Sequence, residues 1–271
     1  MQERFLVLLA TLAVFVFSPS IQAQTAPQSG AGKAIPDLSG IWEGPLNSPG
    51  EPVTLCGEPA CRAVRGLPPP RDLSKNLEEP QMLPWAEERY KALRAAGANA
   101  NGNPLQQLNP SWSGCMPEGP TESTRRRAVE LRQFPDIVFL FYDQDHAVRR
   151  VYMDGRGHPQ GQPLTWMGHS TGKYDGDTLV VDTVGINDKV WVDLQGHLHT
   201  DALHVVERFR RTSQSALEIE ITIDDPKTYE KPWRKQVVRE LQEPGVPQIW
   251  DEAECEELLR MDTHYSAESK K

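Results

Sequence analysis

Residues 165–186 read TWMGHSTGKYDGDTLVVDTVGI, two extended runs on either side of Asp175-Gly176-Asp177. An Asp-Gly pair between runs of this kind is a strong signal for a β-hairpin. Further along, residues 217–223 read LEIEITI, in which apolar and polar side chains alternate throughout. This period of two predicts a strand with one buried face and one solvent-facing face.

Other extended runs surround this hairpin, at residues 137–142, 203–210 and 233–241. Strands that follow one another closely with almost no helix between them predict a mostly β fold, an antiparallel meander closed into a barrel or sandwich. One short helix is predicted from Pro84 to Gly97, in an N-terminal region that is otherwise rich in proline and irregular.

The N-terminus has the order of a secretory signal peptide. Arg4 precedes an apolar run from Phe5 to Phe17, and Ala23 supplies a small residue at the predicted cleavage site. The apolar run is shorter than the roughly 20 residues that a spanning helix needs. We therefore expect residues 1–23 to be removed and the mature protein to be periplasmic or secreted, with no membrane span.

The remainder divides into a flexible tether at 24–36, a single β domain at 37–258 with an irregular Pro-rich insertion at 44–120, and a tail at 259–271. The net charge of −9 argues against nucleic acid as a partner, because nucleic-acid binders usually present a basic face. The only basic cluster is Arg125-Arg126-Arg127, which we interpret as a solvated strand start.

All four cysteines follow the predicted signal peptide, and disulfides persist in exported proteins. Cys56 and Cys61 are close enough in sequence to close a local ring, which leaves Cys115 to pair with Cys255. The alternative is a metal site, for which only the first pair has a common zinc-ligand spacing.

Two carboxylates stand on strand positions where apolar side chains are expected. Glu207 shares a face with Val205 and Phe209, and Asp182 stands between Val180 and Val184. A carboxyl group in an apolar pocket has a raised pKa, which suits a general acid or base.

The candidate catalytic residues are therefore Glu207 and Asp182, with His204 or His169 as the partner. The alternative for Glu207 is a buried ion pair, for example with Arg149 or Arg150 on a neighbouring strand.

Aromatic and cationic residues near these strands are candidates for substrate binding: Trp166, Trp191, Arg156 and Tyr174. We expect Trp191 to line the mouth of a cavity, because it lies in a connection and not inside a strand. His197 and His199 are weak candidates for metal ligands, with His204 or Asp201 as a third donor. We find no nucleophile elbow, which argues against a Ser-His-Asp hydrolase. We also find no nucleotide-binding glycine motif, and we expect no cofactor.

Gly40-Ile41-Trp42, a Gly-x-Trp at the start of a β meander, resembles the opening of lipocalin-like barrels. Longer segments also carry a resemblance: residues 115–117 (CMP), 154–159 (DGRGHP), 165–170 (TWMGHS), 174–183 (YDGDTLVVDT), 199–209 (HTDALHVVERF) and 224–233. They resemble a bacterial family of exported proteins of unassigned function, over nearly all of the mature chain. The resemblance implies a lipocalin-like barrel and export, and the family often carries Asp where this chain has His169.

These observations favour an exported barrel that performs cofactor-free acid–base chemistry on a small, largely apolar molecule. Isomerisation, elimination, hydration and hydrolysis all fit. One alternative is a binding protein or carrier for hydrophobic metabolites, and another is a scaffolding module of the cell envelope.

The chain exported to an oxidising compartment should begin at Gln24 and carry two disulfides. Mass spectrometry of the denatured protein should then give a mass four hydrogens below that of the reduced chain 24–271. A mass that still includes residues 1–23, or that shows free thiols, would contradict this interpretation.

Overall fold

Strands with alternating apolar and polar side chains form the β-sheet of this protein, with their apolar sides turned to the core. In the computed structural model, strand β9 (Ala216–Asp224) buries Leu217, Ile219, Ile221 and Ile223, while the residues between them are only partly covered. The predicted face of this strand is therefore confirmed, and its apolar side forms part of the core.

The structure describes residues 35–43, 74–98, 108–124, 128–143 and 146–242. These residues all belong to one unit, 33–271. The other strands are β1 (Gly40–Glu43), β2 (Ser74–Asn76), β3 (Val129–Gln133), β4 (Ile137–Tyr142), β5 (Val148–Tyr152), β6 (His169–Asp175), β7 (Thr178–Val184), β8 (His204–Arg211) and β10 (Trp233–Leu241).

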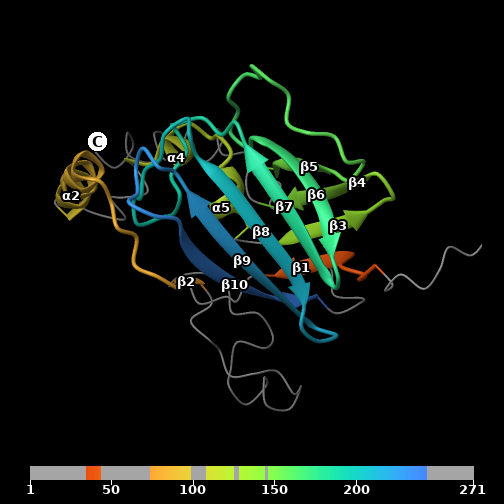
Figure 1. Ribbon diagram of the computed structural model, residues 1–271. Helices are drawn as coiled ribbons and strands as arrows, with labels where there is room; N and C mark the ends of the chain where they lie inside the picture. The colour runs from red at the N-terminus through yellow and green to blue at the C-terminus, as the bar shows by residue number, and fades with distance from the viewer. Residues whose placement is uncertain (1–34, 44–73, 99–107, 125–127, 144–145, 243–271) are drawn as a thin grey trace, which may run out of the picture. The chain divides into compact units, whose positions relative to one another are not determined.

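The strands close into a barrel (Figure 1). The order around the ring is β1, β3, β4, β5, β6, β7, β8, β9 and β10, and β10 pairs with β1 where Trp42 stands opposite Leu241. Strand β2 pairs with the first half of β10. The predicted mostly β fold with a closed barrel is confirmed.

One pairing among the described strands departs from the predicted meander, because β5 and β6 run parallel while the others in the ring are antiparallel. A parallel pair needs a long connection to bring the chain back to the same end. Residues 153–168 are that connection. The β6–β7 hairpin forms as predicted, and Gly176 at its turn has a φ of 63°.

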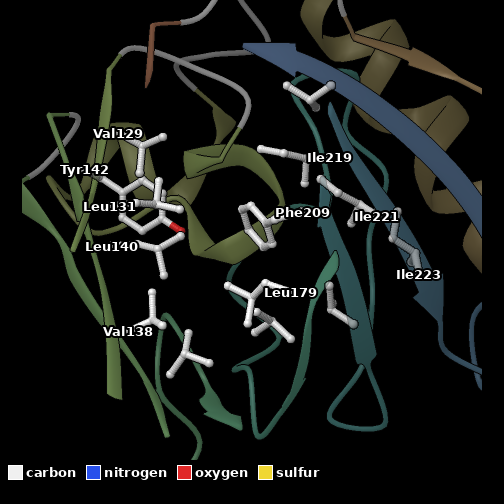
Figure 2. Close-up of a cluster of buried hydrophobic side chains, with 14 of the residues drawn as sticks. Val129, Leu131, Val138, Leu140, Tyr142, Leu179, Phe209, Ile219, Ile221 and Ile223 are labelled. Carbon is white, nitrogen blue, oxygen red and sulfur yellow. The ribbon is translucent and has the colours of Figure 1, made fainter. Parts of the chain in front are cut away.

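The core lies between opposite walls of the barrel (Figure 2). Each fully buried apolar side chain contributes about 1.5–3 kcal/mol relative to an exposed one. The labelled members are Val129, Leu131, Val138, Leu140 and Tyr142 on β3 and β4, and Leu179, Phe209, Ile219, Ile221 and Ile223 on β7, β8 and β9.

Among the described residues, three helical segments precede β3. Helix α2 (Pro84–Ala98) begins at the predicted Pro84 and ends one residue beyond the predicted Gly97. The sequence did not predict α4 (Pro110–Ser113) or α5 (Gly119–Ser123). Both are too short to show a helical period.

Helix α5 lies inside the barrel. All five of its residues are buried, and the Thr121 hydroxyl donates to the carbonyl oxygen of Val192 at 2.8 Å. Thr124, which follows the helix, contacts the side chains of Tyr142 on β4, Glu207 on β8 and Arg239 on β10. These strands lie on different sides of the ring, so the segment fills the interior between them.

Several expectations fall outside the described residues: the signal peptide, most of the tether, the Pro-rich stretch from 44 to 73, Arg125–Arg127 and the C-terminal tail. Cys56, Cys61 and Cys255 also lie outside them. The pairing of Cys115 with Cys255 therefore stays a prediction.

Two glycines offer a matched test of the buried position of α5. Gly119 and Gly155 have similar φ values, 80° and 78°, but a Cβ on Gly119 would lie 2.3 Å from Val190 Cγ1, whereas a Cβ on Gly155 would have no neighbour within 4 Å. We expect Gly155→Ala to cost about 1–2 kcal/mol through backbone strain. Gly119→Ala should cost about 2–5 kcal/mol, because overpacking adds to the strain.

Urea denaturation of both variants measures this difference. Equal losses of unfolding free energy would mean that α5 is not packed inside the barrel.

Candidate functional site

The structure places the four predicted catalytic residues on opposite sides of the barrel wall. Glu207 points into the interior and is fully buried. Asp182, His169 and His204 lie on the outer face and are partly exposed. The four residues therefore do not form one site.

Inside the barrel, Glu207 forms an ion pair with Arg149 Nη2, and both side chains are almost completely buried. Arg149 also donates from Nε to Ser170 Oγ at 2.9 Å and from Nη2 to Thr183 Oγ1 at 2.6 Å. The Thr124 hydroxyl donates to Glu207 Oε1 at 3.2 Å. Residues of β5, β6, β7, β8 and the segment after α5 thus meet at one charge centre.

This arrangement matches the structural alternative for Glu207. The partner is Arg149, whereas Arg150 is exposed. Burial alone would lower the pKa of Arg149, but the charges of Glu207 and Tyr142 and the hydrogen bonds to both together outweigh burial and raise that pKa. Arg149 reaches Glu207 from β5, with β6 and β7 lying between their strands, and not from a neighbouring strand as expected. The ion pair links β5 to β8 and so stabilises the barrel. Because the pair is buried from solvent, Glu207 is not placed to meet a substrate.

On the outer face, Asp182 binds two histidines. Its Oδ1 atom lies 2.9 Å from His158 Nε2 and 3.0 Å from His204 Nε2. The second ring nitrogen of His158, Nδ1, lies 2.8 Å from His169 Nδ1. We call His158, His169, Asp182 and His204 the outer-face histidine cluster.

With Asp182 ionised and the imidazoles neutral, the hydrogen bonds assign the protons of the cluster. An ionised carboxylate only accepts, so His158 and His204 both donate from Nε2 to Asp182. A neutral imidazole carries a single N–H, so Nδ1 of His158 must accept the Nδ1 proton of His169. The Nε2 atom of His169 is then left with a lone pair at the end of a chain that starts at Asp182.

Strand geometry explains why these residues meet. On β6 and β7, Ser170 and Thr183 are buried and bond to Arg149, so their sequence neighbours His169 and Asp182 project outward. The connection 153–168 then brings His158 to the same face. Gly168 has a φ of 68°, and a Cβ there would lie 2.7 Å from the Val184 carbonyl oxygen. The chain can therefore approach β7 closely just before His169.

An aromatic stack supports His169 from one side. The Tyr152 ring stacks on His169 with a centroid distance of 5.3 Å, and the Arg156 guanidinium lies 4.1 Å from the centre of the Tyr152 ring. Arg156 also pairs with Asp154. Burial, together with repulsion from Arg156 and from His158 when that ring is protonated, lowers the pKa of His169 below its ordinary value of 6.5. His169 is therefore a neutral base at neutral pH.

The remaining predicted binding residues lie away from this cluster or in the core. Trp191, expected at the mouth of a cavity, is only 4% exposed. Trp166 packs against the core. The Tyr174 hydroxyl accepts a hydrogen bond of 2.7 Å from Gln133 Nε2 on β3. Of the four, only Arg156 stands beside the outer-face histidine cluster.

The predicted metal candidates bind other partners. His197 Nδ1 pairs with Asp193 at 2.7 Å, and the His197 ring stacks on Tyr90 of α2. His199 Nδ1 donates to the carbonyl oxygen of Thr200 at 2.8 Å, and Asp201 pairs with Lys227. Within the described ranges, no group of three or more His, Cys, Asp or Glu side chains is placed to hold a metal ion.

The barrel's geometry corrects the expected position of Asp182. Asp182 lies on the outer face and not on a dry one, because Leu179, Val181 and Thr183 are the inward residues of β7. Strand β7 is apolar on both faces, so its alternation gave no indication of which face is buried. His158 was not selected from the sequence, although it lies in the DGRGHP segment with Arg156.

No family model matches the chain, and neither the curated proteins nor the solved structures contain a match. In the part of the chain that the structure describes, no helix is long and apolar enough to cross a bilayer. The case for a function therefore rests on the geometry of the cluster.

Replacing Glu207 by Gln should leave the Arg149 charge buried without its partner, which costs about 3–5 kcal/mol of unfolding free energy. Replacing both residues, as Arg149→Met with Glu207→Leu, should cost much less, because no buried charge remains. Asp175→Asn removes a carboxylate from the exposed pair with Arg208 and should leave the unfolding free energy nearly unchanged, because solvent screens such a pair.

Thermal and urea denaturation of the three proteins test these values. A Glu207→Gln variant as stable as the wild type would mean that the ion pair is not structural and that Glu207 is again a candidate catalytic residue.

Proposed function

We propose that this protein is an exported enzyme that performs cofactor-free acid–base chemistry on a small, largely apolar molecule at the outer-face histidine cluster. The observation that carries the proposal is the hydrogen-bonded chain from Asp182 through His158 to His169, which ends in a lone pair on His169 Nε2. Export is proposed from the N-terminal residues 1–23.

The chain of residues supplies what a general base requires. Its pKa should lie near the working pH, and its ring should be held in one orientation. The lowered pKa of His169 keeps it unprotonated at neutral pH. When His169 Nε2 takes a proton, the resulting positive charge is stabilised by Asp182 through His158, as a carboxylate stabilises an imidazolium in catalytic triads.

The surroundings of the base suit an apolar molecule. Tyr152 stacks on His169, and Val184 stands opposite His169 in the β6–β7 register. Val206 stands opposite Asp182 in the β7–β8 register. Val184 and Val206 are both partly exposed. An apolar substrate would cover them while presenting an acidic C–H or an ester group to His169.

A carrier of hydrophobic metabolites is the alternative that the barrel fold allows. Lipocalins hold their ligand inside the barrel, but here α5, the Arg149–Glu207 pair and large buried side chains occupy interior positions. We therefore favour chemistry on the outer face. A ligand that is bound and then released unchanged would identify a carrier, and neither ligand nor turnover would point to a scaffolding module.

5-Nitrobenzisoxazole is a suitable probe because it is small and apolar and needs only a base. Removal of its ring C–H proton to His169 Nε2 forms the nitrile as the N–O bond breaks and leaves a phenolate. His169→Phe should lower the rate about 100-fold or more, the usual contribution of a general base. The rate should fall as pH drops below 6.5, because the pKa of His169 lies under that value.

His146→Asn is the matched control, since His146 is an exposed histidine in the β4–β5 connection with a φ of 48°, which Asn tolerates. It should keep the wild-type rate. Equal rates for the wild type and His169→Phe would rule out His169 as the base.

A further inference from the structure

The connection 153–168 crosses the outer face as an exposed segment. Residues 154–157, 159–161 and 163–165 are exposed, whereas His158 and Gln162 are half-buried. His158 bonds to β6 through His169 and to β7 through Asp182. Gln162 packs against Gly185, where a Cβ would lie 2.5 Å from Gln162 Nε2. Thr165, at the end of the segment, is held by backbone hydrogen bonds with Gly185 and Asn187. His158 is the polar side chain that holds residues 154–164 before it.

The hydrogen bond between the two imidazoles limits the protons that the closed segment can hold. With 2.8 Å between the two Nδ1 atoms, only one proton fits between them. The pair can take up one further proton, at His169 Nε2, without breaking this bond. A proton on both Nδ1 atoms would place two N–H groups and two positive charges face to face, so the bond must break.

Titratable groups from three elements surround His158. Asp182 of β7 accepts its Nε2 proton and also holds His204 of β8. His169 of β6 faces its Nδ1. Asp154 and Arg156 on its own segment form a pair with each other. The single nearby carboxylate that bonds to the cluster is thus already shared by two imidazoles.

We propose that His158 is a pH-operated latch, which holds residues 154–164 closed when the His158–His169 pair shares one Nδ1 proton and releases them when both Nδ1 atoms are protonated. The open form binds more protons than the closed form, so acid favours opening. Release also takes away His158, the bridge between His169 and Asp182, which weakens the base. This regulatory consequence rests on the proposed function, whereas the release of the segment does not.

Hydrogen–deuterium exchange of the full chain at about pH 7.5 and about pH 5, with labelling times scaled to the intrinsic rate, tests the latch. In the wild type, residues 154–164 should lose at least about tenfold in protection at the lower pH, the effect of one pKa unit. Strands β7 to β9 should keep their protection at both values. Unchanged protection of 154–164, or simultaneous loss in β7 to β9, would overturn the proposal.

Two variants isolate the cause. His169→Phe keeps an aromatic ring against Tyr152 but removes the competing imidazole, so protonated His158 stays bonded to Asp182 and the segment should remain closed at both pH values. His204→Gln alters Asp182 without touching the Nδ1–Nδ1 bond and should open like the wild type. Opening of His169→Phe in acid would show that the imidazole pair is not the latch. Exchange is measured without substrate, so this result is independent of turnover.

Discussion

The buried ion pair between Arg149 and Glu207 is the interaction on which the rest of this structure depends. A charge in a dry interior is tolerated only when it is paired and fully hydrogen-bonded. Arg149 satisfies this condition with Glu207, Ser170 and Thr183, while Thr124 completes the carboxylate. Strands β5 to β8 and the segment after α5 are thereby held in one register.

The interior network also determines the outer surface. Ser170 and Thr183 point inward to Arg149, and because side chains alternate along a strand, His169 and Asp182 must point outward. Helix α5 fills interior space that a lipocalin leaves to its ligand. The titratable groups that solvent can reach, His169 and Asp182, therefore lie on the outer face, where the connection 153–168 adds His158.

Residues with a clear pattern were predicted well from the sequence. The alternation in 217–223 identified the buried face of β9, and Asp-Gly located the β6–β7 hairpin. Glu207 was recognised as a carboxylate on a dry face, which is confirmed. The sequence could not decide whether Glu207 is a catalytic residue or part of an ion pair, because a buried carboxylate has the same sequence pattern in both cases. Asp182 was assigned to the wrong face, since β7 is apolar on both sides.

Local patterns in the sequence identify the strands, the main hairpin, the helix at Pro84 and the polar residues that stand out on the strands, because each depends on neighbours within a few positions. Which of these residues meet depends on the folded barrel. Arg149 reaches Glu207 because the ring closes, and His158 joins His169 and Asp182 because a parallel β5–β6 pair requires a long connection over the outer face. Contacts between residues far apart in the chain follow from the closure and register of the barrel, which no local pattern encodes.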